Sequence, residues 1–407
     1  MSRRVLQLSL SADPLNPLDG GDLGGQQIVV RDATLNLQQQ GFGVDVITMS
    51  QHSMLPHRSS LGQLGQVIRM NSAVPMPLSD EDWVKAQDRI AEDVIQWIRD
   101  NHREYQLVHS HFWLSGLIAK RVAAEIKAPW IHSPYKMVEW VRRPHDTYST
   151  VRQEHEQSIL RDVDAVIVPY LKEADMVHQW APNVPLYVVA PGLDVNNFFT
   201  RDPGPVLKGL GLSRRPLAYV GHLDSGRGIR EVLQHMRTVE LPDDLVLLLI
   251  GGNRGEVNQG QPQDPELAQL ANDLAPHLRF LGAMPHRAVA MYMATAQAVI
   301  APNLGPTLGM AVIEALGSGT PVVGSMVPGI EDWIQHGTNG FLAPAGDVTT
   351  LWTHALKLWS DPQLAYQMGV AGYNIIHRNH RSDNMAVQLG QIYDEVVQGY
   401  SPNASAG

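Results

Sequence analysis

Short β-rich apolar runs alternate with longer stretches of helical character along nearly the whole chain of 407 residues. The runs begin with VLQLSLS and GVDVITM and end with PVVGS at residues 321–325. Parallel strands need a crossover connection of a dozen or more residues, usually a helix, so this alternation is typical of βαβ units. The sequence therefore predicts an α/β fold built on parallel sheets.

The alternation breaks once, at APGLDVNNFF (residues 190–199), and restarts at Pro216. A chain of this length exceeds what one hydrophobic core usually supports. We therefore expect two doubly wound, Rossmann-like domains that face a central cleft, at about residues 1–190 and 195–380. Apolar residues at helical spacing between Asn384 and Tyr400 predict a last helix suited to packing back on the first domain. The polar end SPNASAG predicts a disordered tail at 401–407.

Composition excludes several classes of protein. The net charge of -10 argues against a nucleic-acid binder, whose affinity comes largely from basic surface. The absence of cysteine excludes a disulfide scaffold, a thiolate nucleophile and a Cys-ligated metal, and it fits a reducing compartment. No apolar run approaches the roughly 18 residues of a membrane span. The apolar part of MSRRVLQLSLSA is too short for a secretory signal, so we expect a cytoplasmic protein.

A glycine-rich loop follows the first expected strand. Gly20, Gly21, Gly24 and Gly25 precede a helix that opens at about Gln26. Glycines let the backbone approach a ligand closely, and the free N–H groups of a helix start favour an anion. The spacing is not that of a dinucleotide fingerprint, and a flexible loop leading into a helix is the alternative interpretation.

Three histidines lie in LVHSHFWLSG and WIHSP. His109 and His111 alternate along a strand and so share one face, but no carboxylate or cysteine completes a set of metal ligands. We therefore expect no metal site. His132 ends a strand, where it can serve a ligand as a neutral donor or acceptor; a histidine satisfied inside the core is the alternative.

A basic cluster follows in the acidic chain, and it suits a phosphate or carboxylate on a substrate, with a solvated surface helix as the alternative. Its members are Lys136, Arg142, Arg143 and Arg152.

Two loops of the second domain carry groups for an anion. The strand LAYVGHL ends at His222, and Arg227 follows on a glycine-flanked turn, from which a guanidinium can contact a pyrophosphate bidentately. Gly305 and Gly309 then lead into a helix start. Glu314 lies more than one turn along that helix, where it can accept hydrogen bonds from a sugar diol or form a salt bridge inside the domain.

In order along the chain, these motifs resemble the retaining glycosyltransferases of the GT-B fold, in the large fourth family that contains sucrose-phosphate synthases and the inositol-phosphate N-acetylglucosaminyltransferase of mycothiol synthesis. The resemblance covers nearly the whole chain. It rests on DGGDLGGQQ, HSHFWLSG, IHSPYK, VVAPGLDVNNF, YVGHLDSGRGI, LRFLGAMPH and NLGPTLGMAVIEALGSGTPVVGS.

The resemblance assigns roles residue by residue. It implies that His132, Arg227 and His222 are catalytic and that Glu314 contacts the ribose hydroxyls of a nucleotide. The implied donor-binding residues are Gly24, Gly25, His222, Arg227, Leu308, Gly309, Met310 and Glu314. The implied acceptor-binding residues are Gln26, Lys136 and Arg152.

The chain departs from the family pattern at three positions. The family has two glutamates eight positions apart, and the first, which contacts the donor sugar, is Pro306 here. The usual arginine of the phosphate turn is His222, and the usual lysine is Arg227.

The resemblance implies transfer of a hexose, with retention, from a nucleotide sugar to a hydroxyl of a sugar phosphate or polyol phosphate, with UDP-glucose as the first donor to test. It implies no cofactor, no metal and no side chain as general base, since the donor phosphate takes the proton. A catalytically degenerate paralogue that acts as a nucleotide-sugar sensor or scaffold is the alternative. A nucleotide-sugar epimerase would need a pair of acids near the sugar, and we find none. The sequence leaves the oligomeric state open, with a homo-oligomer as one alternative.

Overall fold

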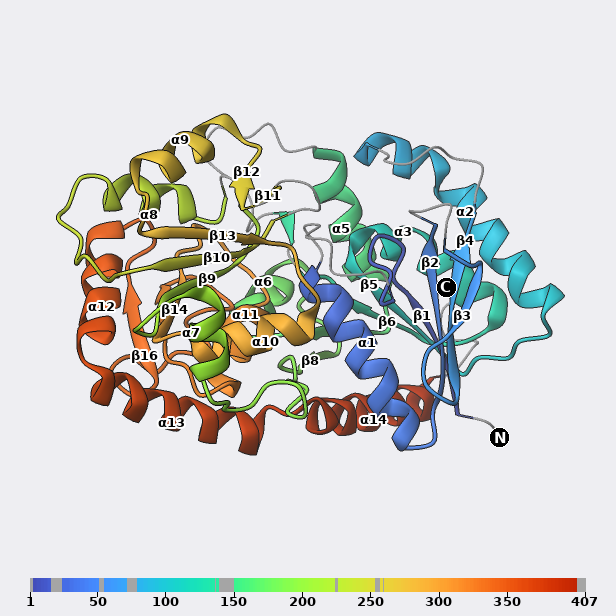
Figure 1. Cartoon of the computed structure of the whole chain (residues 1–407). Helices are drawn as coiled ribbons and strands as arrows, with labels where there is room; N and C mark the ends of the chain where they lie inside the picture. Colours follow the sequence, from blue (N-terminus) through green and yellow to red (C-terminus); the bar gives the residue numbers. More distant parts are fainter. Residues whose placement is uncertain are drawn as a thin grey trace. The chain divides into compact units, whose positions relative to one another are not determined.

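The computed structural model describes residues 3–15, 24–50, 55–71, 79–135, 137–138, 150–223, 226–252, 257–258 and 260–400. The chain forms two compact units, each with an α/β fold on a mainly parallel sheet, and the predicted fold class is confirmed (Figure 1). Unit 1 comprises Met1–Asn16, Gln26–Gly192 and Ser382–Gly407. Unit 2 comprises Pro17–Gly25 and Leu193–Arg381.

The sheet of unit 1 has the strand order β3-β4-β2-β1-β5-β6-β7-β8. All neighbouring strands pair in parallel except β3 and β4, which are antiparallel. The strands are β1 (Arg4–Leu8), β2 (Gly43–Met49), β3 (Arg58–Ser60), β4 (Gly65–Met70), β5 (Leu107–His111), β6 (Trp130–Ser133), β7 (Ala165–Val168) and β8 (Leu186–Val188).

Both faces of this sheet are covered, because successive residues of a strand point to opposite faces. On β2, Ile47 belongs to the large core under α2 and α3, whereas Val46 packs with Val30 of α1 on the other face. The helices of unit 1 are α1 (Gly24–Gln39), α2 (Asp80–Asp100), α3 (Phe112–Ile126), α5 (Thr150–Asp162), α6 (Leu171–Trp180) and α14 (Ser382–Gly399).

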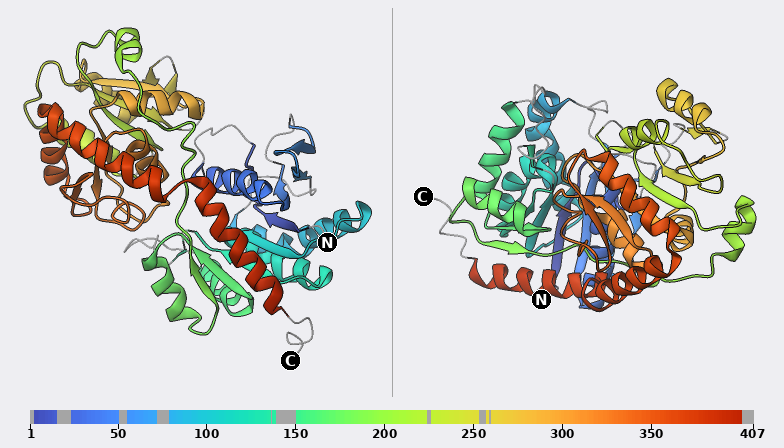
Figure 2. Two further views of the ribbon diagram at one scale, coloured as in Figure 1. Left: turned by 90° about the horizontal axis from the view of Figure 1, so that it is seen from below. Right: turned by 90° about the vertical axis from the view of Figure 1, so that its left-hand side faces the viewer.

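The last helix, α14, lies alongside the sheet of unit 1, as both views of Figure 2 show. Its buried Tyr393 contacts Phe42 edge-on, with ring centroids 5.9 Å apart, and forms a hydrogen bond with His109 of β5. The tail 401–407, for which we expect disorder, lies outside the described residues.

Unit 2 is built on a six-stranded parallel sheet with the order β13-β10-β9-β14-β15-β16. Its strands are β9 (Leu217–Gly221), β10 (Leu247–Gly251), β13 (Leu278–Gly282), β14 (Ala298–Ala301), β15 (Val322–Ser325) and β16 (Gly340–Ala343), besides a short hairpin of β11 (Val257–Asn258) and β12 (Gln261–Pro262). Its helices are α7 (Gly204–Leu210), α8 (Ile229–Met236), α9 (Pro265–Asp273), α10 (His286–Thr295), α11 (Met310–Gly317), α12 (Val348–Ser360) and α13 (Pro362–Asn379).

The core of unit 2 joins the sheet to α8, α9, α12 and α13 through fully buried aliphatic side chains such as Leu217, Leu233 and Leu358. Each such side chain contributes about 1.5–3 kcal/mol by leaving water. Three helices of unit 2, α9, α12 and α13, begin at an aspartate whose side chain caps the first turn. The Asp264 carboxylate, for example, accepts the backbone N–H of Leu267 and so caps α9.

Each sheet has one point at which the strand order reverses, and ligands of open parallel sheets bind beyond the carboxyl ends of the strands there. In unit 1 this switch point lies between β1 and β5, and in unit 2 between β9 and β14. The loops that follow these four strands are therefore where a ligand site is expected.

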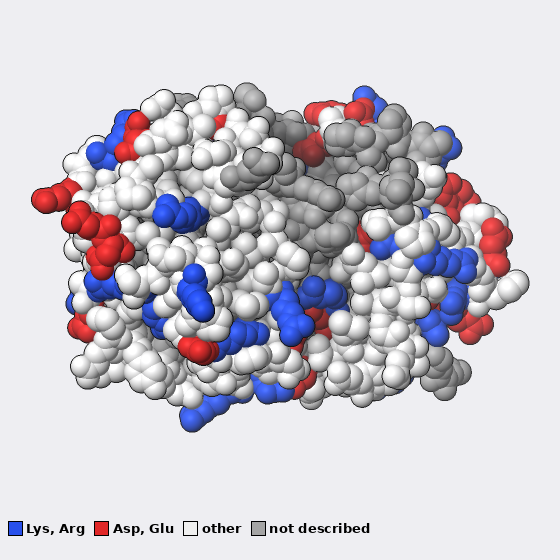
Figure 3. All heavy atoms as spheres, viewed as in Figure 1, with Lys and Arg blue, Asp and Glu red and all other residues white. Residues whose placement is uncertain are grey.

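Acidic and basic side chains are interspersed on the described part of the face in Figure 3. Among the described residues, no helix combines the length and the apolar character that crossing a membrane requires.

Candidate functional site

The turn after β9 lies against the end of β14. Gly228 has a φ of 73°, and a β-carbon there would overlap the carbonyl oxygen of Pro302, so only glycine fits. The backbone N–H of Leu304 also donates to the carbonyl of Gly226, at 3.4 Å. The structure thus joins the turn that carries Arg227 to the loop that leads into α11, although some 80 residues separate them in sequence.

Helix α11 follows the loop that this junction holds. Its N-cap, Gly309, has a φ of 72°, and a β-carbon would overlap the carbonyl oxygen of Gly329. Leu308 precedes the cap, and Met310 is the first helical residue. The first turn of α11 carries no acidic side chain, so its unpaired N–H groups and dipole favour an anion in the space beyond it.

Glu314 lies on α11 with only 3% of its surface exposed. His286, the first residue of α10, places its ring Nε2 2.7 Å from Glu314 Oε1. An ionised carboxylate only accepts hydrogen bonds, so the histidine donates here. An interaction inside the domain, one of the two alternatives for Glu314, is therefore present. A ribose contact through the second oxygen, Oε2, remains a prediction.

The backbone carbonyl of His222, at the end of β9, accepts a hydrogen bond from the hydroxyl of Tyr219. This bond fixes the turn at the carboxyl end of the strand. His222 and Arg227 are both partly exposed, and both lie on the switch-point side of the unit 2 sheet. Their catalytic and phosphate-binding roles stay predictions.

In unit 1, His132 is the residue before the last of β6 and has 1% of its surface exposed. Its Nδ1 lies 2.8 Å from Ser110 Oγ, which also accepts a hydrogen bond from Trp130 Nε1 at 2.7 Å. Burial lowers the pKa of His132 to about 3, so the ring is neutral at physiological pH. A neutral ring agrees with the expected donor or acceptor, and the bond to Ser110 also satisfies one ring nitrogen inside the sheet.

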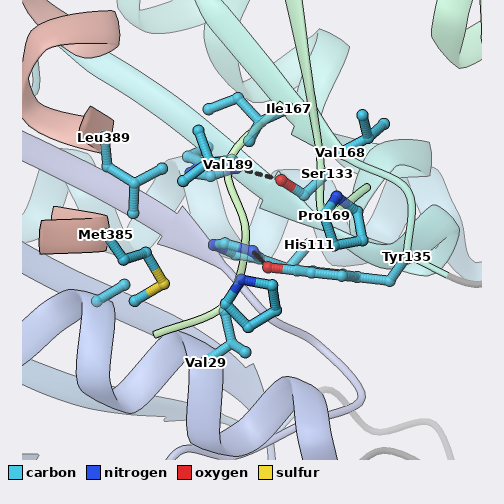
Figure 4. A pocket seen from close by; sticks show the side chains of 13 residues that line it. Val29, His111, Ser133, Tyr135, Ile167, Val168, Pro169, Val189, Met385 and Leu389 are labelled. Atoms are coloured by element: carbon cyan, nitrogen blue, oxygen red, sulfur yellow. Dashed lines mark hydrogen bonds between the residues drawn. The ribbon is translucent and has the colours of Figure 1, made fainter. Parts of the chain in front are cut away.

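His109 and His111 share one face of β5, as their alternation predicts, and their ring centroids are 4.1 Å apart. They line a pocket of about 20 Å³, together with residues of α1 and α14 (Figure 4). His109 contacts Tyr393 and Ser133, and His111 Nδ1 lies 3.1 Å from the Tyr135 hydroxyl. His111 Nε2 is buried without a partner among the described residues. The space suffices for about one water molecule.

No group of three or more His, Asp or Glu side chains in the described part of the chain is placed to hold a metal ion.

Arg152, an expected acceptor ligand, is already engaged inside unit 1. Its Nε donates to Glu156 Oε1 at 2.8 Å, and its guanidinium stacks over Phe112 and Trp113 at 5.0 and 5.7 Å from their ring centroids. Glu156 Oε2 in turn accepts the backbone N–H of Val138. The Arg152 side chain is therefore oriented before any ligand binds.

The other expected acceptor ligands have different outcomes. Gln26 is buried in α1, and its Nε2 donates to Ser9 Oγ at 3.2 Å and to the carbonyl of His111 at 3.5 Å. Its Oε1 is buried without a partner among the described residues. The third expected acceptor ligand, Lys136, lies outside the described residues. The same holds for other residues of the glycine-rich loop and the basic cluster, namely Gly20, Gly21, Arg142 and Arg143. Gly24 and Gly25 are the first two residues of α1.

Sequence reasoning missed a buried acid, Glu173 of α6. Its carboxyl is fully buried, and both oxygens are without a hydrogen-bond partner among the described residues. Burial, reinforced by the nearby Glu156, raises the pKa of Glu173 to about 8. The run AVIVPYLKEADMV gave no signal of this, because an acid in the first turn of a helix is ordinary.

Two family models match the chain. Residues 24–192 match the glycosyl transferase 4-like domain, and residues 214–361 match the glycosyl transferases of group 1. The two matches cover the body of unit 1 and most of unit 2.

Curated relatives share about a quarter of the sequence over almost the full length. The D-inositol 3-phosphate glycosyltransferase of Corynebacterium urealyticum is 27% identical over 411 residues, which are 96% of this chain and 95% of the relative. The enzyme of the same name from Corynebacterium efficiens is 28% identical over 415 residues, 97% of this chain and 96% of the relative.

Solved structures share the fold. Sucrose-phosphate synthase from Thermosynechococcus elongatus superposes with a TM-score of 0.86 at 23% identity, over 98% of this chain and 100% of that one. Anabaena HepE in complex with UDP and glucose superposes with a TM-score of 0.75 at 17% identity, over 97% and 100%.

Proposed function

The chain belongs to the group 1 glycosyltransferases with the GT-B fold, and on this premise we propose that it transfers a hexose from a nucleotide sugar to a hydroxyl of a sugar phosphate or polyol phosphate, with retention. UDP-glucose is the first donor to test, because a structural relative, Anabaena HepE, was solved with UDP-glucose. The acceptor class is favoured by the D-inositol 3-phosphate glycosyltransferases among the relatives and by the likeness to sucrose-phosphate synthase.

The observation that carries this proposal is the junction of two loops at the switch point of unit 2. Gly228 and Pro302 join the turn of Arg227 to the loop that leads into α11, at the carboxyl ends of the adjacent strands β9 and β14. A guanidinium on one of the joined loops and a helix N-terminus at the end of the other suit a diphosphate, because both favour negative charge. Glu314, farther along α11, is then the acceptor for ribose hydroxyls.

Unit 1 supplies groups for the acceptor in this proposal. Arg152 is oriented by Glu156 and would contact the acceptor phosphate through its outer N–H groups. Gln26 Oε1, buried without a partner in the described residues, would accept a hydrogen bond from an acceptor hydroxyl. His132, neutral and held by Ser110, would contact the donor sugar.

In the proposed reaction the acceptor oxygen bonds to the anomeric carbon while the bond from that carbon to the donor phosphate oxygen breaks. The acceptor proton passes to the departing phosphate oxygen, so the products are the glycoside and the nucleoside diphosphate. The protein lowers the barrier by holding the two substrates together and by stabilising the charge of the diphosphate. The charge of the diphosphate would be stabilised by Arg227, the start of α11 and His222. We propose that no metal is required.

Pro306 and His222 favour the alternative, a protein that binds nucleotide sugars without turnover. A charge-assisted hydrogen bond contributes about 1.5–3 kcal/mol, so one missing contact to the donor sugar costs roughly ten- to a hundredfold in rate. Such a loss weakens an enzyme without abolishing it. We therefore prefer the enzyme, since Arg227 keeps the positive charge of the usual lysine and Glu314 is retained.

The test incubates the purified chain with UDP-glucose, ADP-glucose and GDP-mannose, each with a panel of sugar and polyol phosphates, and measures release of nucleotide. Arg227→Ala and Glu314→Ala are run alongside, with circular dichroism to verify folding, and one arm contains EDTA. Release that needs an acceptor, falls in both variants and persists in EDTA supports the proposal. Saturable binding without turnover supports the sensor, and no binding of any donor contradicts both.

A further inference from the structure

The contact between His286 and Glu314 joins two helices of unit 2. His286 opens α10 and Glu314 lies on α11, with 14% and 4% of their side-chain surfaces exposed. The ring nitrogen Nε2 lies 2.7 Å from the carboxylate oxygen Oε1, a short distance that is typical of a charge-assisted hydrogen bond. The contact therefore fixes one of the two carboxylate oxygens.

The imidazole itself is held in place. Phe198 meets the ring of His286 edge-on, with centroids 4.8 Å apart and an interplanar angle of 61°. Phe198 is fully buried, and the backbone of His286 is fixed as the first residue of a helix. A rigid donor restricts the carboxylate to one rotamer, because other rotamers lose the hydrogen bond while the acid stays buried.

We propose that His286 is a positioning residue for nucleotide binding: it holds Glu314 so that the second carboxylate oxygen, Oε2, meets the ribose hydroxyls of the bound nucleotide. The inference rests on the proposed function, since it needs Glu314 to contact ribose. Glu314 contributes the charge, and His286 contributes the orientation. Without His286 the Glu314 carboxylate is free to turn away, so the affinity falls only for ligands that carry the ribose hydroxyl.

The test compares each nucleoside diphosphate with its 2′-deoxy and 3′-deoxy counterparts, for UDP, ADP and GDP, by titration calorimetry. For each hydroxyl, the dissociation constant of the deoxynucleotide divided by that of the ribonucleotide measures how strongly the hydroxyl is recognised. For the nucleotide that binds best, we expect the wild type to prefer the ribonucleotide about ten- to a hundredfold for at least one hydroxyl. Glu314→Ala should reduce this ratio to about one.

Three histidine variants separate orientation from structure. His286→Phe should reduce the ratio to near one and leave the affinity for the deoxynucleotide within about twofold, because packing against Phe198 remains. His286→Gln keeps an N–H donor and should recover part of the ratio. His377→Phe is the matched control: His377 Nε2 donates to the carbonyl of Gly317 at the other end of α11, so its loss should leave the ratio unchanged.

The outcomes are distinct. If the wild type and Glu314→Ala behave as expected but His286→Phe keeps the full ratio, or weakens both ligands equally, then His286 has only a structural role and the inference is wrong. If the wild type binds none of the nucleotides, the proposed function itself falls, and the inference falls with it.

Discussion

Gly228 lies directly against the carbonyl of Pro302, so close that a single β-carbon would overlap the oxygen. This contact ties the turn after β9 to the loop after β14, and it requires both a positive φ and the absence of a side chain. The two loops carry Arg227 and the start of α11. The proposed diphosphate site therefore depends on this close backbone contact.

We predict that Gly228→Ala abolishes binding of the nucleotide sugar. The left-handed conformation alone costs a non-glycine residue about 1–2 kcal/mol, and the collision with Pro302 must in addition push the loops apart. Calorimetric titration with the donor measures the loss of binding, and thermal unfolding measures the loss of stability.

Gly337→Ala is the matched control for this variant. Gly337 has a similar φ of 79°, but a β-carbon there meets no atom within 4 Å. It should show the conformational cost, about 1–2 kcal/mol of unfolding free energy, and normal binding. Equal effects of both variants on binding would contradict the role assigned to the junction.

A second prediction concerns the attachment of α14 to unit 1. The Tyr393 hydroxyl forms a buried hydrogen bond with His109 Nδ1 at 2.6 Å, whereas the Tyr187 hydroxyl reaches Glu395 of the same helix at an exposed site. Tyr393→Phe should lower the free energy of unfolding by about 1–3 kcal/mol, because the histidine nitrogen loses a buried partner. Tyr187→Phe should cost less than about 0.5 kcal/mol, since water replaces the bond. Denaturant titration measures the free energy of unfolding of both variants. Equal losses would contradict the larger contribution assigned to the buried bond.

A third prediction concerns pH. Burial raises the pKa of Glu173 from 4.5 to about 8, so between these values the native protein binds more protons than the unfolded chain. Its stability therefore falls as pH rises through this window. Glu173→Gln stays neutral at every pH and should exceed the wild type in stability at pH 9, on the order of a few kcal/mol since each pKa unit is about 1.4 kcal/mol.

The same variant should show a much smaller difference at pH 5, where the wild-type carboxyl is protonated in the native protein. Asp175→Asn, an exposed acid of the same helix, serves as the control and should give no such pH-dependent gain. A Glu173→Gln variant that is less stable than the wild type at pH 9 would show that the carboxyl is charged and paired in the native protein.

A fourth prediction addresses the departure at Pro306. The residue lies in the loop before α11, where the resemblance implies a glutamate that contacts the donor sugar. Pro306→Glu should raise kcat/KM by roughly ten- to a hundredfold, because it restores a charge-assisted hydrogen bond. Pro306→Gln, which adds similar length without charge, should gain much less. No gain in either variant would show that this chain recognises its donor sugar differently.

The strands that the sequence predicted are present, because strands buried on both faces of a parallel sheet form short continuous apolar runs. β4 was missed since Arg69 interrupts its run GQVIRM. The structure explains this arginine: it is 2% exposed, and its Nε lies 2.6 Å from Asp13 Oδ2. The edge strand β3 is polar and partly exposed, so it carries no apolar pattern.

Short motifs marked Arg227 and Gly309 as candidates, and the structure joins the turn of one to the loop that leads to the other, while their roles stay predictions. Contacts between distant segments left no trace in the sequence. His286 lies 28 residues before Glu314, and nothing about its own neighbours marks it as the partner of that acid. The pairing of Arg152 with Glu156 was equally hidden, since an acid four residues after an arginine is common on any helix.

The most direct test of the central claim is to follow UDP-glucose and the preferred acceptor phosphate by proton NMR in the presence of the purified chain. We predict that the anomeric signal of the donor decays while that of an α-glycoside grows in equal amount, and that Arg227→Ala slows both. A donor signal that persists with every acceptor and every donor sugar, although the nucleotide sugar binds, would contradict the account.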